Sequence, residues 1–544
     1  MSNPKNKNEC SRRDFLKGGS AATLMAMLGA VPLAAQPAPS SISAAPKGKD
    51  APEDSLTAKA PAGIRAPAWT KDLVIYEIAT KGFTSPSGPE SGTFKSLQAK
   101  IPYLKNLGVS GIWLTGHSLS DSKHFYNIWT QYACVDPFRM DPSLGTADEF
   151  KELIGAFHRA GIHVLLDVIS HGVMNNSPLI KEHPDWFKGG TWGMTDYDWK
   201  ARNPALDRWW VEGWVDTATR YGVDGFRVDV SLFRPDLWLE IRRRCAAAGH
   251  PIVICPEPSE LIAGTTDFSQ SYLRVSRANN AAVSLTQAGT DMAGFILSAY
   301  GAPGPRLENQ RAKGIFGSLQ LSCHDGGWEG FPPDSNPYVA QGSRCVFGYA
   351  FIFAPAIPVF MSGEEFDCDF QPLPTLSPGL FGGKNPGKGR WLYGSMIVWP
   401  QVDQPRHRAM LKDVARMIAI RREYADVLAA EMISDAPRIA AVPIAGDGTS
   451  GLPKPYVRWN GEKAILIAGN PTGKALQVQA NFSPAVCGWP PKTVTVTDIW
   501  PTPARSTETF AANSGGVVSI PLTLAPDHTP GGGVGVWTIE LRGK

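Results

Sequence analysis

The sequence predicts an α/β protein: a (β/α)8 TIM barrel with a short insertion after strand three, followed by a C-terminal all-β sandwich domain. From about Lys71 onward, short apolar runs alternate with helical patterns, which favours a barrel over an open sheet. Polar residues stand where several of these runs end, and the strand ends of a barrel meet at the rim that carries its active site. Beyond about Leu428 the helical periodicity stops, which predicts the sandwich.

Residues 1–66 are expected to be an export signal and a linker. The pair Arg12-Arg13 precedes a moderately apolar stretch and resembles a twin-arginine export signal. Residues 1–35 are therefore predicted to be a signal peptide that engages the twin-arginine export machinery. Residues 36–66 are rich in Ala, Pro and Ser and predict a flexible linker. The mature protein is expected to be soluble, periplasmic or secreted, with no stable membrane anchor.

The catalytic barrel is assigned to residues 67–428, with its strands in chain order. Apolar spacing predicts helices over 93–107 and 146–160, the second with Thr146 as its N-cap. No Gly-x-Gly-x-x-Gly follows the first strand, which disfavours a dinucleotide-binding sheet. The eight expected strands span 73–78, 111–115, 162–169, 223–230, 252–255, 268–272, 319–322 and 357–361.

Two regions depart from this alternation. Residues 171–202 are irregular and are expected to form a short rim insertion that contributes to the substrate cleft. Residues 429–544 are assigned to the sandwich, because alternating β segments there are separated by turns rich in Pro, Gly and Ser. These β segments are expected at 457–460, 464–468, 494–499, 517–524 and 534–541.

Charge and cysteine content exclude several classes of function. The chain has 53 Lys and Arg against 50 Asp and Glu, interspersed, so no nucleic-acid partner is expected. Of the 8 cysteines, Cys10 belongs to the signal, which leaves an odd number and no disulfide scaffold. Cys255 and Cys323 stand in apolar strands and are interpreted as small buried hydrophobes. The sequence has no metal-ligand spacing such as Cys-x-x-Cys.

Four short segments carry the groups that cleavage of a sugar bond needs. They span residues 167–171, 225–229, 255–257 and 322–325, and each follows or ends a predicted strand. Besides Asp167, the set brings three carboxylates, an Arg and two His toward one rim. These residue types suit acid, base and nucleophilic work at a sugar carbon. The order of the set carries the signal, because each segment alone occurs by chance.

The four segments resemble the conserved regions of glycoside hydrolase family 13, the α-amylase family, and the resemblance runs from about Trp69 to the end of the chain. It implies an exported retaining hydrolase that cleaves α-glucosidic bonds in α-glucans or malto- and isomalto-oligosaccharides through a covalent glycosyl-enzyme intermediate. Further segments stand in the order of the family: Val74-Ile-Tyr-Glu77, Asp136-Pro137, Leu144-Gly-Thr146, Arg202-Asn-Pro204, Gly222-Val-Asp-Gly-Phe-Arg227 and Gly363-Glu-Glu365.

The resemblance assigns catalytic roles to three carboxylates. Asp229 would be the nucleophile, and Glu257 would protonate the leaving oxygen and then activate water. Asp325 would hold hydroxyls of the distorted sugar and stabilise positive charge in the transition state. Arg227 lies two residues before Asp229, so both side chains point to the same side of the strand and the Arg would keep that carboxylate ionised.

The resemblance also implies how the sugar is held. His171 and His324 would donate hydrogen bonds to its hydroxyls, and Tyr126 would stack on its ring. Asn127 follows Tyr126 where the family usually has Asp. Asp167 would be structural at the end of its strand. Three tryptophans are candidate sugar platforms at the cleft mouth: Trp192, Trp199 and Trp328.

Other departures from the family limit what carries over. Ser170 replaces an Asn that is a calcium ligand in many relatives, and the rim insertion holds few carboxylates. The sequence therefore predicts no cofactor and disfavours the usual calcium site. Leu232 and Phe233 replace a common Lys-His pair and indicate an unusual acceptor side of the cleft. Two alternatives stay open: a transglycosylase (glucanotransferase), and a non-catalytic relative that binds carbohydrate or protein.

Overall fold

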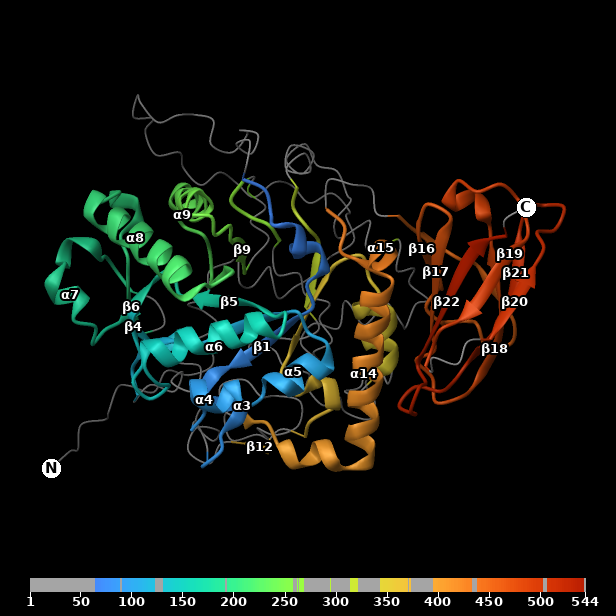
Figure 1. Cartoon of the computed structure of the whole chain (residues 1–544), viewed down its shortest axis with the longest axis horizontal. Helices are drawn as coiled ribbons and strands as arrows, with labels where there is room; N and C mark the ends of the chain where they lie inside the picture. The colour runs from blue at the N-terminus through green and yellow to red at the C-terminus, as the bar shows by residue number, and fades with distance from the viewer. Residues whose placement is uncertain are drawn as a thin grey trace, which may run out of the picture.

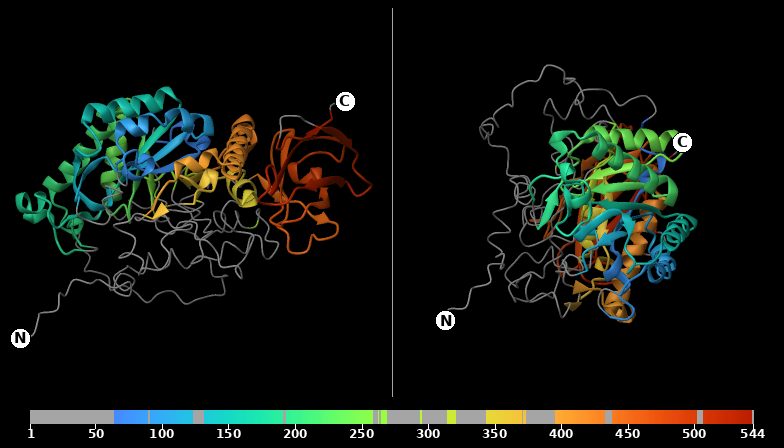
Figure 2. Two further views of the ribbon diagram at one scale, coloured as in Figure 1. Left: turned by 90° about the horizontal axis from the view of Figure 1, so that it is seen from below. Right: turned by 90° about the vertical axis from the view of Figure 1, so that its left-hand side faces the viewer.

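The computed structural model describes residues 64–88, 91–122, 131–190, 193–257, 262, 264–268, 294, 314–320, 343–369, 371–372, 395–432, 438–501 and 506–542. Within these ranges the chain forms an α/β body and an all-β unit that follows it (Figure 1). The long helix α14 (Pro405–Glu423) lies between the two, as Figure 1 and the left view of Figure 2 show.

Seven parallel strands form the described part of the central sheet, in the order β10-β11-β1-β2-β5-β8-β9. Among these seven, neighbours in the row follow one another along the chain except at one pair: β11, the last, pairs with β1, the first, as expected where a barrel closes. The seven are β1 (Ile75–Ala79), β2 (Gly111–Thr115), β5 (His163–Val168), β8 (Gly225–Val228), β9 (Val253–Pro256), β10 (Ser318–Gln320) and β11 (Ile357–Met361).

The strands are apolar because nearly all of their residues are buried on both faces of the sheet. The predictions for the second and eighth strands match β2 and β11 at both ends. The sixth predicted strand, at 268–272, lies outside the described residues except for Phe268.

The helices pack on the sheet through one apolar cluster that includes Phe150, Trp214 and Trp238. Thr146 caps α6 as predicted, and its amide is bound in return by the Glu149 carboxylate. The barrel helices are α3 (Thr80–Thr84), α4 (Phe94–Gln98), α5 (Ile101–Leu107), α6 (Ala147–Arg159), α7 (Leu179–Glu182), α8 (Pro204–Tyr221), α9 (Pro235–Ala247), η8 (Val346–Ile352, a π-helix), α14 and α15 (Ala425–Leu428). Short 3-10 helices are η1 (Ala68–Asp72), η3 (Gln131–Ala133), η4 (Pro184–Trp186), η5 (Trp199–Ala201), η9 (Glu364–Phe366), η10 (Trp399–Asp403) and η11 (Pro484–Cys487).

Two predictions for the barrel region were wrong in detail. The single helix expected over 93–107 is two helices, α4 and α5, and Pro102 stands in the first turn of α5. Proline has no amide proton to continue a helix, but it fits a helix start. The insertion at 171–202 is not irregular: β6 (Gly172–Met174) and β7 (Met194–Asp196) form a hairpin in it. Further short pairs are β3 (Ser118–Ser120) with β4 (Cys134–Met140), and β12 (Gln371–Pro372) with β13 (Ser395–Met396).

The all-β unit is an antiparallel sandwich of a six-stranded sheet, β14-β16-β17-β22-β19-β20, and a three-stranded sheet, β15-β18-β21. The inner faces share an apolar core, in which Leu466 and Ile539 of one sheet pack with Phe482 and Ile520 of the other. The strands are β14 (Ile439–Ala441), β15 (Ile444–Ala445), β16 (Tyr456–Asn460), β17 (Lys463–Gly469), β18 (Leu476–Phe482), β19 (Val494–Asp498), β20 (Thr507–Phe510), β21 (Val518–Leu524) and β22 (Val534–Leu541).

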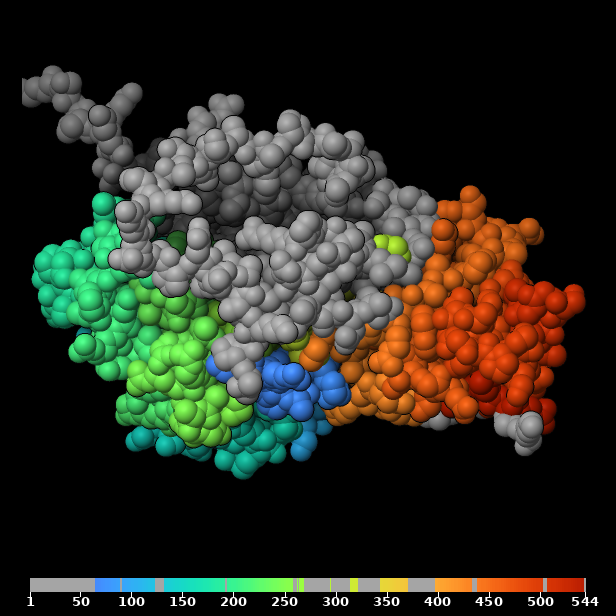
Figure 3. Space-filling view, turned by 90° about the horizontal axis from the view of Figure 1, so that it is seen from above, coloured from blue at the N-terminus to red at the C-terminus, as the bar shows by residue number. Residues whose placement is uncertain are grey.

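Buried polar contacts join the sandwich to the barrel. The Asp527 carboxylate accepts hydrogen bonds from the Ser343 hydroxyl at 2.5 Å and the Arg344 amide at 2.9 Å, at the start of η8. Arg458 of the sandwich is fully buried and donates to the Phe353 carbonyl of the barrel at 3.4 Å. The space-filling view shows the α14 region and the sandwich in continuous contact (Figure 3).

Candidate active site

The carboxyl ends of β5, β8 and β9 place the first predicted site residues side by side. The strands are in register there, with Asp167 beside Arg227 and Arg227 beside Cys255. Asp229 follows β8 directly, and its amide donates to the Val168 carbonyl at 2.9 Å. Glu257 follows β9 directly, and its amide donates to the Val228 carbonyl at 2.9 Å. Strand pairing therefore holds both candidate catalytic carboxylates at one rim.

Arg227 is the centre of this group. Its guanidinium contacts Asp167 at 3.0 Å, Asp229 at 2.5 Å and Glu257 at 3.3 Å, and it lies 4.7 Å from the centre of the Trp113 ring. Burial alone would lower the pKa of Arg227. The carboxylate of Asp167 and the other acidic groups beside it raise the pKa by more, so it lies well above its usual value. Arg227 thus stays a cation and balances part of the negative charge around it.

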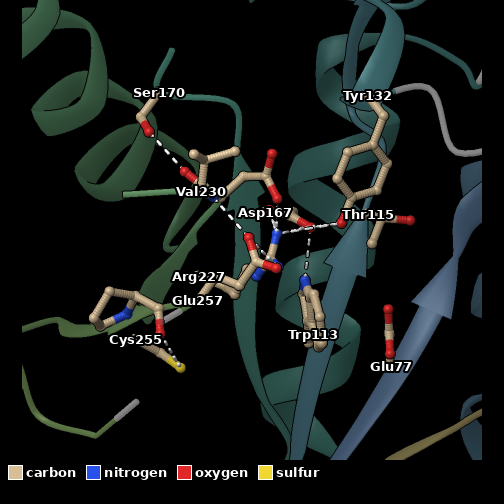
Figure 4. Close-up of polar contacts among 12 residues, drawn as sticks. Glu77, Trp113, Thr115, Tyr132, Asp167, Ser170, Arg227, Val230, Cys255 and Glu257 are labelled. Atoms are coloured by element: carbon tan, nitrogen blue, oxygen red, sulfur yellow. Dashed lines mark hydrogen bonds and ion pairs between the residues drawn. The ribbon is translucent and has the colours of Figure 1, made fainter. Parts of the chain in front are cut away.

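Asp167 anchors the group from inside the sheet. It is fully buried, and besides Arg227 it accepts hydrogen bonds from the Trp113 indole at 3.0 Å and the Tyr132 hydroxyl at 2.5 Å (Figure 4). A buried carboxylate is stable when charged and neutral donors surround it in this way. Its contacts suit a residue that fixes the orientation of Arg227.

Glu257 is held on the side of Arg227 that faces away from Asp167. Its Oε2 accepts a hydrogen bond from the Val230 amide at 2.8 Å, and Figure 4 shows the side chain between Val230 and Arg227. The Glu257 side chain is 22% exposed and that of Asp229 is 11% exposed, against 0% for Asp167. Asp229 and Glu257 are therefore the carboxylates of this group that a substrate at the rim can reach.

His171 lies beside the same rim, on the rim insertion. It is buried, and its Nδ1 stands 3.5 Å from the Asp196 carboxylate of β7. The Tyr197 amide also donates to the His171 carbonyl at 2.8 Å, so the β6–β7 hairpin fixes this residue on two sides. The predicted residues Tyr126, His324 and Asp325 lie outside the described residues, as do Trp192 and Trp328.

Trp199, one of the candidate sugar platforms, is turned into the interior of the protein. The side chain is buried, its ring packs against Tyr197 and Trp210, and its indole N–H donates to the Ser170 carbonyl at 2.8 Å. The neighbouring aromatic residues of α8 occupy the space around it, which the sequence did not reveal.

Sequence reasoning missed several residues that shape the site. Trp113 and Tyr132 hold Asp167, and Val230 holds Glu257 through its amide. The position of Trp113 in a predicted strand was the one available signal, because an inward-facing indole in a barrel needs an acceptor. A backbone amide such as that of Val230 leaves no signal in the side-chain sequence.

Ser170, which stands where many relatives of the family have a calcium-binding Asn, does not fit a cation. The Ser170 hydroxyl donates to the carbonyl oxygens of Asp229 at 2.8 Å and of Ser231 at 2.6 Å. A hydroxyl proton thus stands where a calcium ion would need oxygen lone pairs. Among the described residues, no group of three or more His, Cys, Asp or Glu is arranged to hold a metal ion.

Two family models match parts of this chain. A family model described as alpha amylase, catalytic domain, matches residues 77–185, and a model of the TAT (twin-arginine translocation) pathway signal sequence matches residues 9–29. The described part of the chain contains no helix that is long and apolar enough to cross a membrane.

Two curated relatives share parts of the chain. The alpha-amylase MalA of Haloarcula japonica is 31% identical over 203 residues, which cover 33% of this chain and 28% of that protein. The maltogenic alpha-amylase of Bacillus acidopullulyticus is 23% identical over 480 residues, which cover 78% of this chain and 73% of that protein. These matches support the expectation of a glycoside hydrolase.

Solved structures confirm the predicted fold class. The noncanonic maltogenic alpha-amylase AmyB from Thermotoga neapolitana has a TM-score of 0.62 at 15% identity, covering 87% of this chain and 100% of that chain. The alpha-amylase from Geobacillus thermoleovorans has a TM-score of 0.59 at 15% identity, covering 87% and 99%. At this identity the likeness concerns the fold: a TIM barrel followed by an all-β domain. Residues 77–185 of the chain thus match the alpha amylase catalytic domain, and residues 9–29, ahead of them, match a twin-arginine signal sequence.

Proposed function

We propose that this chain is an exported, retaining glycoside hydrolase that cleaves α-glucosidic bonds in α-glucans or malto- and isomalto-oligosaccharides. The observation that carries the proposal is the contact of one guanidinium, that of Arg227, with both Asp229 and Glu257. Two carboxylates beside one side chain favour the close spacing of retaining enzymes over the spacing of about 6.5–9.5 Å in inverting ones. The signal sequence supports action in the periplasm or outside the cell.

In the proposed mechanism, Asp229 attacks the anomeric carbon while Glu257 protonates the leaving oxygen. Water activated by Glu257 then hydrolyses the glycosyl-enzyme intermediate. Arg227 keeps Asp229 ionised and oriented, and His171 donates a hydrogen bond to a sugar hydroxyl. His324, Asp325 and Tyr126 complete the proposed site by family resemblance: Asp325 and His324 hold sugar hydroxyls, and Tyr126 stacks on the ring.

Product analysis tests the proposal. The mature protein is incubated with maltooligosaccharides, pullulan, panose and cyclodextrins; products are sized by chromatography, and the anomer first released is identified by proton NMR. We expect shorter products with the α configuration. Asp229→Asn should lower kcat at least about 1000-fold without unfolding the protein. The matched control, Asp216→Asn on the exposed face of α8, should keep full activity. A β product, or near-wild-type turnover by Asp229→Asn, would contradict the mechanism.

A transglycosylase is the second candidate, and one feature of the site favours it. The loop that follows Asp229, residues 229–233 (the Asp229 loop), ends in two apolar residues. Leu232 is buried and Phe233 is 42% exposed, so this side of the site is apolar. An apolar surface favours a sugar acceptor over water at the intermediate. Products longer than the substrate would select this alternative in the same chromatograms. No turnover on any substrate would favour the non-catalytic carbohydrate- or protein-binding relative.

A further inference from the structure

Ser170 ties together three segments around the candidate catalytic carboxylates. It is buried just beyond the end of β5. Its hydroxyl is shared between the carbonyl oxygens of Asp229, at 2.8 Å, and Ser231, at 2.6 Å, while its own carbonyl accepts the Trp199 indole N–H. One proton shared by two acceptors forms a three-centre hydrogen bond, which fixes both carbonyl groups at once. Ser170 therefore holds the backbone on both sides of Val230.

Val230 lies between these two carbonyl groups in a conformation that it would not adopt alone. Its φ is 60°, in the left-handed region, where a β-branched side chain is strained. In this conformation the Val230 amide points at Glu257, whose Oε2 lies 2.8 Å away (Figure 4). Such strain persists when the surrounding structure determines the backbone more strongly than local preference does.

One backbone hydrogen bond also acts across Val230: the Ser231 amide donates to the Asp229 carbonyl at 2.7 Å. Strand pairing ends at the Asp229 amide, which donates to the Val168 carbonyl, and the Leu232 side chain is buried beyond the turn. Between these two anchors, the Ser170 hydroxyl is the side-chain group that binds the carbonyl groups on both sides of Val230. Loss of the hydroxyl would let this peptide relax toward negative φ and turn its amide away from Glu257.

We infer that Ser170 is a positioning residue for catalysis: its hydroxyl holds the strained Val230 peptide so that the amide orients the Glu257 carboxyl group toward the leaving oxygen. The inference rests on the proposed function, in which Glu257 is the acid and base. It also explains how the Asp229 loop is held although the residues do not fit a calcium ion. The Ser170 hydroxyl, just beyond the end of β5, binds the backbone after Asp229 directly.

Two donors that differ in their need for an acid test this inference. A maltosyl fluoride loses fluoride with little proton assistance, whereas a 4-methoxyphenyl α-maltoside needs the acid. For Ser170→Ala we expect kcat/KM to fall about 10- to 100-fold on the aryl maltoside and less than about 3-fold on the fluoride, with KM and the unfolding temperature near wild type. An equal loss on both donors, or no loss on either, would overturn the inference.

A double-mutant cycle with Val230→Gly tests the path of the effect. Glycine adopts a φ of about 60° without strain, so the peptide no longer needs to be held. In the Val230→Gly background, Ser170→Ala should therefore cost less than about 3-fold on the aryl maltoside. Effects that multiply independently would show that Ser170 does not act through Val230. If Ser170→Ala fails to fold, Ser170→Cys, a weaker donor of similar size, should show the same preference for the fluoride.

The outcomes separate this inference from the proposed function. Wild-type protein that turns over neither donor contradicts the proposed function. Amide hydrogen exchange at Val230 then decides the inference: exchange should be at least about 10-fold faster in Ser170→Ala than in wild type, and an unchanged rate would overturn it. Addition of a chelator should change neither the exchange rate nor the activity, because in this inference the Ser170 hydroxyl, and not a calcium ion, holds the Val230 peptide.

Discussion

At the scale of single residues, charge balance around Arg227 decides whether the site can form. One buried cation contacts three carboxylates, of which Asp167 is fully buried. Arg227→Met would leave Asp167 charged in the interior without its cation, and removal of one partner of such a pair costs about 3–5 kcal/mol of unfolding free energy. Because Asp229 also loses its orientation, kcat should fall at least about 100-fold. Denaturant unfolding followed by tryptophan fluorescence, together with kinetics, measures both effects.

An exposed ion pair provides the control for this prediction. Arg243 and Glu240 pair on α9 with side chains 54% and 41% exposed, and pairs of this kind contribute about 0–1 kcal/mol. Arg243→Met should therefore leave activity unchanged and shift the unfolding free energy by less than about 0.5 kcal/mol. Similar stability losses in the two variants would contradict the assigned role of Arg227.

Side chains at strand ends were predictable from the sequence, whereas their partners were not. Asp167, Arg227, Asp229 and Glu257 stand at or just after the strands from which they were identified. Tyr132 reaches Asp167 from the segment before β4, where no sequence pattern predicted this contact. Long-range hydrogen bonds of this kind depend on how loops return to the sheet, and periodicity does not encode that path.

At the scale of elements, two glycines in helix interiors should respond oppositely to the same change. Gly155→Ala in α6 would place a Cβ 3.3 Å from the flexible end of Arg159, and the gain in helix propensity should stabilise the protein by up to about 1 kcal/mol. Gly213→Ala in α8 would place a Cβ 2.2 Å from the Phe138 ring. That ring packs against Trp209 and Trp214, so it cannot move freely.

The clash in α8 should outweigh the gain in helix propensity. Overpacking a core costs about 1–3 kcal/mol, against about 1 kcal/mol gained by removing a helical glycine. Gly213→Ala should therefore unfold at lower denaturant concentration than wild type, and Gly155→Ala at a higher one. A shift of the same sign in both variants would show that α8 and β4 do not approach each other this closely.

The elements that the sequence missed share one property: their signals are short. The β6–β7 hairpin has strands of three residues each, too short for alternation to stand out. Among the sandwich strands, β18 was missed although Val478, Ala480 and Phe482 alternate inward, because polar residues separate them. The strands found from the sequence, such as β17 and β22, carry longer apolar runs.

At the scale of the whole molecule, the stability should depend on pH through three groups: the buried Glu365 and Asp224, and His158, whose side chain is 37% exposed. Burial raises the pKa of Glu365 to about 7, although hydrogen bonds from Tyr103 and Tyr76 partly oppose the shift. The hydrogen bond to Asp224 raises the pKa of His158. The pKa of Asp224 is lowered to about 2, because its bonds to His158 and His163 outweigh its burial, which would raise it.

The sign of each contribution follows from the protons bound. Between about pH 4.3, where an unfolded Glu titrates, and pH 7, folded Glu365 keeps a proton that the unfolded chain releases, so stability falls as pH rises. His158 stabilises the fold fully below about pH 6.5, and this stabilisation is lost as pH rises through its raised pKa. Asp224 contributes above about pH 3.9, and its contribution is lost as pH falls toward 2. Stability should therefore be greatest on the acidic side of neutrality.

A single variant isolates the largest of these contributions. Glu365→Gln removes a titration that changes the unfolding free energy by at most about 1.4 kcal/mol per pH unit. Its unfolding temperature, measured by scanning calorimetry from pH 5 to 8, should fall less steeply than that of wild type, whatever its absolute value. Glu240→Gln, at an exposed position on α9, should keep the wild-type slope. Equal slopes in wild type and Glu365→Gln would mean that Glu365 is ionised throughout this range and that burial does not govern its proton.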